Sequence, residues 1–272
     1  MSKTDDRIKD IREQQIGNSA KRALIVEGAD DVDAFQSFLG KVYRDWEQSW
    51  VVAEAGKKTE VLAIIRKEPD WIGVVDRDEW SAPKIADLET ELTNLWFLPR
   101  YCIENYLLVP EELWGALPGN QQNKIAGGLA QLNQSIANNL DRWRCHGVLW
   151  SVINPMWEGL RSLGFKEALL DPAIATNEAE IKAKLQEWHD YLEPDQIWQN
   201  YQDALTQVVQ LPVDEQLKRV IHGKYFYEQM VNPLLNQLLG QKSVTDRQRA
   251  IFRYLPVPND LTPLWQKMGL AV

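Results

Sequence analysis

Acidic side chains stand at the ends of two apolar runs that are far apart in the sequence. Glu27 closes the run 24–26, and Asp76 and Asp78 close the run 72–75. Short runs rich in β-branched residues are typical of buried parallel strands, and ligands bind beyond the carboxyl ends of such strands. Three carboxylates in one small volume repel one another unless a cation lies between them. Because hard oxygen ligands near phosphate chemistry usually hold Mg²⁺, we expect a magnesium site here, with Mn²⁺ as a substitute.

The surrounding elements indicate how these acids are positioned. Apolar runs at 24–27, 50–53, 71–75 and 95–98 alternate with helical patterns at 30–43, 57–67 and 85–92. This alternation predicts a parallel sheet of the α/β class. Beyond residue 110 the periodicity becomes helical, and Asn177 with Glu180 resembles a capping box. We therefore expect an α/β domain at 1–110, with a leading helix, and an all-helical domain at 111–272.

Composition and charge restrict the function. The chain has 272 residues, of which 44% are hydrophobic and 25% charged, an ordinary globular balance. No apolar run approaches the ~20 residues that span a bilayer, and the N-terminus lacks a signal-peptide core, so we expect a cytoplasmic protein without membrane contact. The net charge of −9 disfavours nucleic-acid binding through bulk charge, yet residues 216–254 carry seven basic against two acidic residues. A polyanion should be held there or by a metal.

Several short motifs, taken in their order and spacing, resemble the Toprim domain shared by topoisomerases, primases and OLD-family nucleases. The motifs are Val26-Glu27-Gly28-Ala29-Asp30-Asp31, Ala55-Gly56-Lys57-Lys58, Asp76-Arg77-Asp78 and Cys102-Ile103-Glu104-Asn105-Tyr106-Leu107. Together they resemble a domain-of-unknown-function group of OLD-like Toprim proteins, some of which act in antiphage defence, including the nuclease effector of the PARIS system. The likeness covers residues 22–110 and reaches the helical half only at Ile221-His222-Gly223-Lys224.

The resemblance implies a Toprim-like fold and a Mg²⁺-dependent nuclease that cleaves DNA or RNA in antiphage defence. The metal ligands that it implies are Glu27, Asp31, Asp76, Asp78 and Glu104. The catalytic residues that it implies are Glu27, Asp76, Asp78 and Lys224. Bound Mg²⁺ would polarise a phosphodiester and acidify an attacking water, and a cation at Lys224 would stabilise the transition state. An exposed helix lysine is the alternative for Lys224.

The resemblance also favours a phosphate site at Gly56 and Lys57. The glycine precedes a helix N-terminus, whose backbone N–H groups and neighbouring ammonium suit an anion. A turn with solvated lysines is the alternative. Val51 stands where a Walker pattern needs its first glycine, so we expect no ATP site.

Three arginines near the C-terminus alternate with aromatic residues and could hold a nucleic-acid backbone. They are Arg247, Arg249 and Arg253. A solvated amphipathic helix explains the pattern equally well.

Two further functions stay open. The chain could be a non-catalytic metal- or nucleotide-binding regulatory module, in a complex whose activity belongs to a separate ATPase partner, a partner suggested by family analogy alone. It could also be a latent toxin that is silent until it is released from a complex. Association with further copies of the chain stays open as well. A topoisomerase is disfavoured because the chain has no room for Tyr-bearing gate domains, and a primase because zinc-ribbon spacing is missing.

Overall fold

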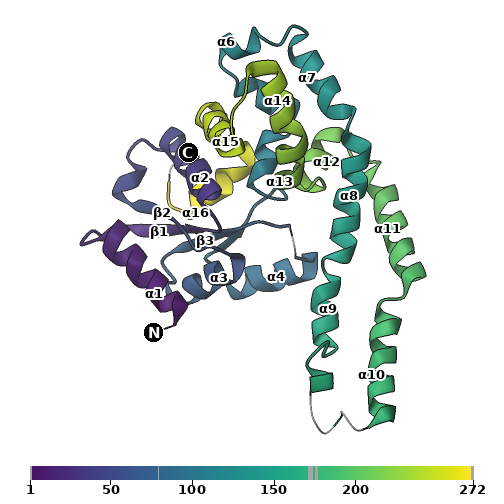
Figure 1. Ribbon diagram of the computed structural model, residues 1–272. Coiled ribbons are helices and arrows are strands. Elements are labelled where there is room, and N and C mark those ends of the chain that lie inside the picture. The colour runs from purple at the N-terminus through teal and green to yellow at the C-terminus, as the bar shows by residue number, and fades with distance from the viewer. Residues whose placement is uncertain (1, 79, 171–173, 175–176, 271–272) are drawn as a thin grey trace.

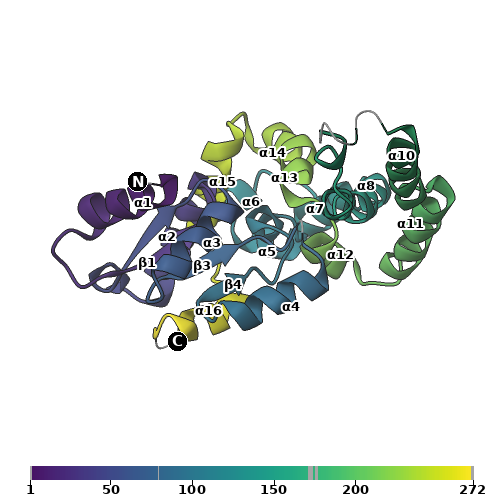
Figure 2. The same ribbon diagram turned by 90° about the horizontal axis from the view of Figure 1, so that it is seen from below.

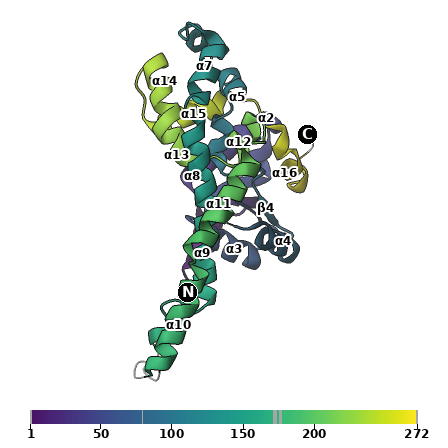
Figure 3. The same cartoon turned by 90° about the vertical axis from the view of Figure 1, so that its right-hand side faces the viewer.

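The chain folds around a parallel β-sheet with helices on both faces, and a helical arm extends away from it (Figures 1 and 3). The structure is a computed structural model that describes residues 2–78, 80–170, 174 and 177–270.

Four parallel strands form the sheet of the described residues, which confirms the α/β prediction. Their order across the sheet is β2-β1-β3-β4. The strands are β1 (Arg22–Val26), β2 (Trp50–Glu54), β3 (Ile72–Val75) and β4 (Leu95–Phe97). β1 pairs with β3 through Leu24 and Ile72. The carboxyl ends of β1 and β3 therefore lie side by side.

Different helices cover the two faces of the sheet. They are α2 (Ala29–Val42), α3 (Lys58–Lys67) and α4 (Ala82–Glu91). Because successive strand residues point to opposite faces, Leu24 and Val26 pack with α2, while Ala23 and Ile25 pack with α3 and α4. Figure 1 shows α2 above the sheet and the other two helices below it.

The crossover helices determine where a crevice forms. α2 links β1 to β2, and α3 links β2 to β3 on the other side of β1. Right-handed crossovers that run in opposite directions place their helices on opposite faces, so the winding reverses between β1 and β3. This switch point leaves a crevice beyond the carboxyl ends of these strands, where ligands bind in open α/β sheets.

The other regular elements of the described chain are helices. α1 (Lys3–Asp10) continues as a π-helical turn, and a 3-10 turn (Ile103–Leu107) follows β4. The remaining α-helices are α5 (Pro110–Gly115), α6 (Gly119–Gln122), α7 (Gly128–Ala137), α8 (Leu140–Ile153), α9 (Met156–Ser162), α10 (Glu178–Tyr191), α11 (Pro194–Val208), α12 (Val213–Arg219), α13 (Gly223–Phe226), α14 (Asn232–Leu239), α15 (Val244–Tyr254) and α16 (Thr262–Lys267). The Asn177 side chain accepts the Glu180 N–H at 3.3 Å, so the expected cap of α10 is present.

The apolar core includes residues from both sides of position 110. The Phe252 ring lies 5.8 Å from that of Phe38, and Trp265 lies 6.3 Å from Phe35. One apolar cluster thus joins the sheet, α2, α15 and α16. The face of the sheet that carries Leu24 and Val26 is apolar and must be shielded from water. Of the three crossover helices only α2 lies on this face, and the C-terminal helices cover the remainder of it.

The arm consists of α8, α9, α10 and α11. α11 packs along α8, and Figure 2 shows both beside α10, at the side of the molecule opposite to α1. An ion pair between Lys84 and Glu158 holds α9 beside α4. Within the described ranges, none of the helices combines the length and apolar character needed to cross a bilayer.

Candidate functional site

Glu27 and Asp76 stand at the switch point of the sheet, on neighbouring strands. Glu27 directly follows β1 and Asp76 directly follows β3. The Glu27 Oε1 atom accepts the backbone N–H of Asp76 at 2.8 Å. This hydrogen bond ties the two strand ends together and holds the Glu27 carboxylate beside the second acid.

Two more carboxylates reach the same place from flanking segments. Asp31, in the first turn of α2, accepts the Gly28 N–H at 2.8 Å, which caps the helix and fixes the side chain. Glu104 lies in the 3-10 turn after β4 and is 6% exposed. All four acids line one pocket of about 270 Å³, which we call the acidic pocket. Its other lining residues are Gly28, Ala29, Asp30, Gly56, Asp78, Cys102, Ile103, His222 and Lys224.

Burial and the neighbouring charges favour the protonated form of three of these acids, namely Asp31, Asp76 and Glu104. Burial, followed by the charges of Glu104 and Glu27, raises the pKa of Asp31 to about 8. The pKa of Asp76 lies well above its usual range, mainly because of burial and then because of Asp31. Burial also raises the pKa of Glu104, although the Lys224 ammonium opposes this. A divalent cation in the pocket would reverse these shifts, because it favours ionised carboxylates.

The donor set fits a hard divalent cation. Mg²⁺ prefers oxygen ligands, keeps several waters and needs only one or two carboxylates, a pair that Glu27 and Asp76 can supply. Among the described residues, no three acidic, His or Cys side chains already surround one point. Asp31 and Glu104 would therefore act through side-chain rotation or through metal-bound waters, for which a pocket of about 270 Å³ has room.

Lys58 is a site residue that sequence analysis missed. It is 8% exposed, forms an ion pair with Asp78, and its charge opposes the rise in the pKa of Asp76. Lys57, the expected phosphate ligand, is the exposed N-cap residue of α3. The signal was present in the sequence: position 58 continues the apolar stripe of Val61, Leu62 and Ile65 by helical spacing. The fold thus carries Lys58, not Lys57, to the acids.

Asp78 differs from the other acids in its surroundings. It lines the acidic pocket, but its carboxylate is paired with Lys58. Its charge is therefore balanced by a lysine of the same chain, whereas Glu27 and Asp76 meet at a backbone hydrogen bond.

Lys224 reaches the acidic pocket from the helical half, and close packing at Gly223 places it there. A Cβ atom on Gly223 would lie 2.1 Å from Asn105 Oδ1 and 2.7 Å from Cys102 Sγ, so a larger residue does not fit. The Asn105 amide donates to two carbonyls at the end of α12 and just beyond it, at 2.6 and 2.9 Å. These contacts join the turn that carries Glu104 to the segment that carries Lys224.

Cys102 and His222 line the acidic pocket in uncharged forms. Burial raises the pKa of the Cys102 thiol well above its usual range, and the carboxylates of Glu104 and Asp76 add to this. Burial, with a contribution from His146, lowers the pKa of His222 to about 4. At neutral pH the pocket therefore contains a thiol and a neutral imidazole.

The arginines of α15 are used mainly within the protein. Arg247 is 4% exposed and donates to Asn232 Oδ1 at 3.1 Å and to Asn236 Oδ1 at 2.6 Å, which holds α15 against α14. The expectation that it contacts nucleic acid is wrong, because its position lies on the buried side of the helix. Arg249 pairs with Asp33 of α2, while Arg253 is exposed.

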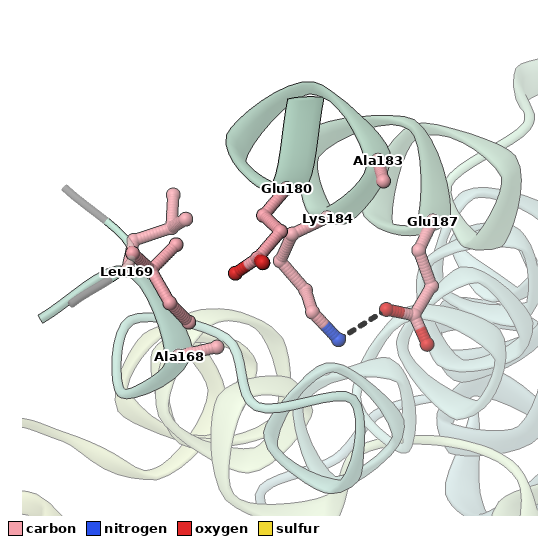
Figure 4. Close-up of a pocket in the computed structure, with 7 residues that line it drawn as sticks. Ala168, Leu169, Glu180, Ala183, Lys184 and Glu187 are labelled. Carbon is pink, nitrogen blue, oxygen red and sulfur yellow. Dashed lines mark hydrogen bonds and ion pairs between the residues drawn. The ribbon is translucent and has the colours of Figure 1, made fainter. Parts of the chain in front are cut away.

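A larger cavity, of about 390 Å³, lies at the far end of the arm (Figure 4). Its cation, Lys184, pairs with Glu187 of the same helix. Apart from these two residues and Glu180, the described lining is aliphatic. Among its described residues, this cavity therefore lacks the grouped reactive side chains of the acidic pocket.

Neither a protein-family model nor a curated protein sequence matches this chain.

Proposed function

We propose that this protein is a Mg²⁺-dependent nuclease of the Toprim type that hydrolyses phosphodiester bonds of DNA or RNA. The observation that carries the proposal is the meeting of Glu27 and Asp76 at the switch point of a parallel sheet, with Asp31 and Glu104 beside them. The resemblance of the motifs to OLD-like nucleases supports the same function. A role in antiphage defence, with a separate ATPase as partner, belongs to this proposal on the resemblance alone.

In this function the carboxylates would hold the cation and the lysines would complete the site. When bound, a divalent cation would polarise the phosphodiester and acidify a water. Lys224, exposed at the rim of the acidic pocket, is positioned to contact a phosphate oxygen and to favour charge that develops on it. Lys58 would hold Asp78 and the segment after β3 in place through its ion pair.

The charge of the acidic pocket sets a condition on substrate binding. At this pocket an ionised carboxylate repels phosphate and a protonated one carries no charge that attracts it, so a phosphodiester should enter only when a cation is bound. Divalent metal is therefore expected to be required for binding at the pocket as well as for cleavage.

The test is cleavage of labelled RNA and single-stranded DNA in Mg²⁺ or Mn²⁺ by matched variants. Glu27→Gln and Asp76→Asn should lower the rate by at least ~100-fold, since each removes a group that acts on the transition state. Glu54→Gln is the matched control, because Glu54 ends the neighbouring strand β2 but does not line the pocket. If Glu27→Gln cleaves as fast as the wild type, the proposed nuclease function is wrong and the non-catalytic regulatory module is favoured.

A further inference from the structure

Aromatic rings are grouped beside the acidic pocket. The His222 ring, part of the pocket lining, stacks on Tyr225 at a centroid distance of 4.3 Å. Trp150 of α8 lies 5.4 Å from His222 and 6.3 Å from Tyr225, in edge-to-face contacts. Tyr225 is 36% exposed, so this cluster is in part open to solvent.

The same helical rod presents a second aromatic side chain farther along. α8 and α9 are nearly continuous, because Asn154 and Pro155 between them keep helical dihedral angles. Trp150 and Trp157 are two helical turns apart and so lie on one side of the rod, about 10 Å from each other. Trp157 is 56% exposed.

A hollow of about 330 Å³ connects this side of the rod to the segment after β3. Trp157 and Arg161 line it from α9, and Trp80 lines it from the loop that follows Asp78. The Lys84 ammonium lies 5.1 Å from the centre of the Trp80 ring and pairs with Glu158. The Lys58 ammonium, which pairs with Asp78 of the acidic pocket, lies 5.3 Å from the centre of the same Trp80 ring, so Trp80 joins this hollow to the edge of the pocket.

We propose that this aromatic face, formed by Trp80, Trp150, Trp157 and Tyr225 with Arg161, binds the unpaired bases of a single-stranded nucleic acid whose phosphodiester enters the acidic pocket. The proposal rests on the proposed nuclease function for the role of the pocket and adds the class of substrate.

The chemistry of the face favours this occupant. Stacking on exposed indole and phenol rings tolerates any sequence and needs no net positive charge, which suits a chain with a net charge of −9. The exposed Arg161 can contact the phosphate backbone between bases. In a duplex the bases are stacked on one another, so they are not available to stack on the aromatic side chains of the protein.

The test measures binding apart from cleavage. The probe is a short fluorescein-labelled oligo(dT), with oligo(U) as its RNA counterpart, and anisotropy is recorded in CaCl₂ with the full chain. Trp157→Ala should weaken single-strand binding about 10-fold, the effect of losing one stacked base. Tyr225→Leu should weaken single-strand binding to a similar degree. A dA·dT duplex should bind more weakly than the single strand, and neither substitution should change its affinity.

Trp198→Ala is the matched control, because Trp198 is 57% exposed on α11 and lines neither hollow. It should bind as the wild type does, and thermal unfolding should show that all variants stay folded. Equal affinity of wild type and Trp157→Ala, equal losses in Trp157→Ala and Trp198→Ala, or a preference for duplex would overturn the proposal. So would a Trp157→Ala variant that changes only the oligomeric state, since the face would then be a contact between copies. If cleavage is lost in Glu27→Gln but Trp157→Ala binds single strands as the wild type does, the aromatic face is not the binding site, while the proposed nuclease function stands.

Discussion

The stability of the metal-free protein should fall as the pH rises from 6.5 to 8. Burial raises the pKa of Asp31 to about 8, so the folded protein keeps a proton that the unfolded chain, with an ordinary value of 3.8, has already released. His222 acts in the opposite direction only at lower pH. Its pKa is lowered from 6.5 to about 4, so between these values the unfolded chain binds the proton and acid destabilises the fold. Lys41, whose pKa burial lowers from 10.5 to about 8, opposes the trend only near pH 8, so over most of this window the carboxyl groups set the slope.

The size of the effect follows from proton linkage. A full difference of one bound proton changes the free energy of unfolding by about 1.4 kcal/mol per pH unit. Asp31 titrates partly within this window and is half-buried, so we expect a loss of about 1 kcal/mol between pH 6.5 and 8. For a chain of this length that corresponds to a fall of roughly 2–4 °C in Tm.

The assay is thermal unfolding in EDTA and in MgCl₂ across this pH range. Mg²⁺ binds the ionised carboxylates, so it should stabilise more at pH 8 than at pH 6.5; at ~100 times its Kd it adds about 2.7 kcal/mol. Asp31→Asn keeps an oxygen that can accept the Gly28 N–H but removes the titrating group, and should flatten the slope in EDTA. Asp141→Asn, at a side chain that is 94% exposed on α8, is the control and should not. An unchanged slope in Asp31→Asn would refute the reasoning.

Three further predictions concern packing around the site. Gly223→Ala should lower the free energy of unfolding in urea by about 1–3 kcal/mol, because its Cβ would lie 2.1 Å from an amide oxygen, whereas Gly115→Ala, with nothing within 4 Å, should not destabilise. Arg247→Ala should cost about 2–4 kcal/mol in the same assay and Arg253→Ala less than about 0.5 kcal/mol; equal costs would contradict the structural role of Arg247. Lys58→Met should leave the Asp78 carboxylate unpaired, lower the free energy of unfolding by about 3 kcal/mol and reduce the cleavage rate at least ~10-fold. A variant with wild-type stability and cleavage rate would show that this ion pair is dispensable.

The sheet and the central acids could be predicted because local signals determine them. The strands are short apolar runs with helical patterns between them, and all four lie within a residue or two of their expected places. Glu27 and Asp76 follow from the same pattern, since carboxyl ends of parallel strands share one edge of a sheet. The predicted cap at Asn177 likewise depends on neighbouring residues alone.

The remaining features depend on long-range packing. The apolar stripe of α3 indicates that Lys58 faces the sheet, but the sequence does not show that Asp78 is the acid that it meets there. Arg247 looked like a surface residue because the sequence does not show that α14 and α2 enclose α15 on several sides. The change of periodicity at residue 110 marks where the strands stop, but it does not show that helices near the C-terminus pack on the open face of the sheet. A Toprim-type topology stays a prediction, while an α/β fold with a parallel sheet and a helical region is what the structure shows.

Binding of a divalent cation in the acidic pocket is tested most directly by anomalous diffraction from a crystal soaked in Mn²⁺ at pH 8. We predict an anomalous peak within about 2.5 Å of carboxylate oxygens of both Glu27 and Asp76, and no such peak in the Glu27→Gln variant. Full soaking with no peak at this pocket, or a peak that persists unchanged in the variant, would contradict the claim.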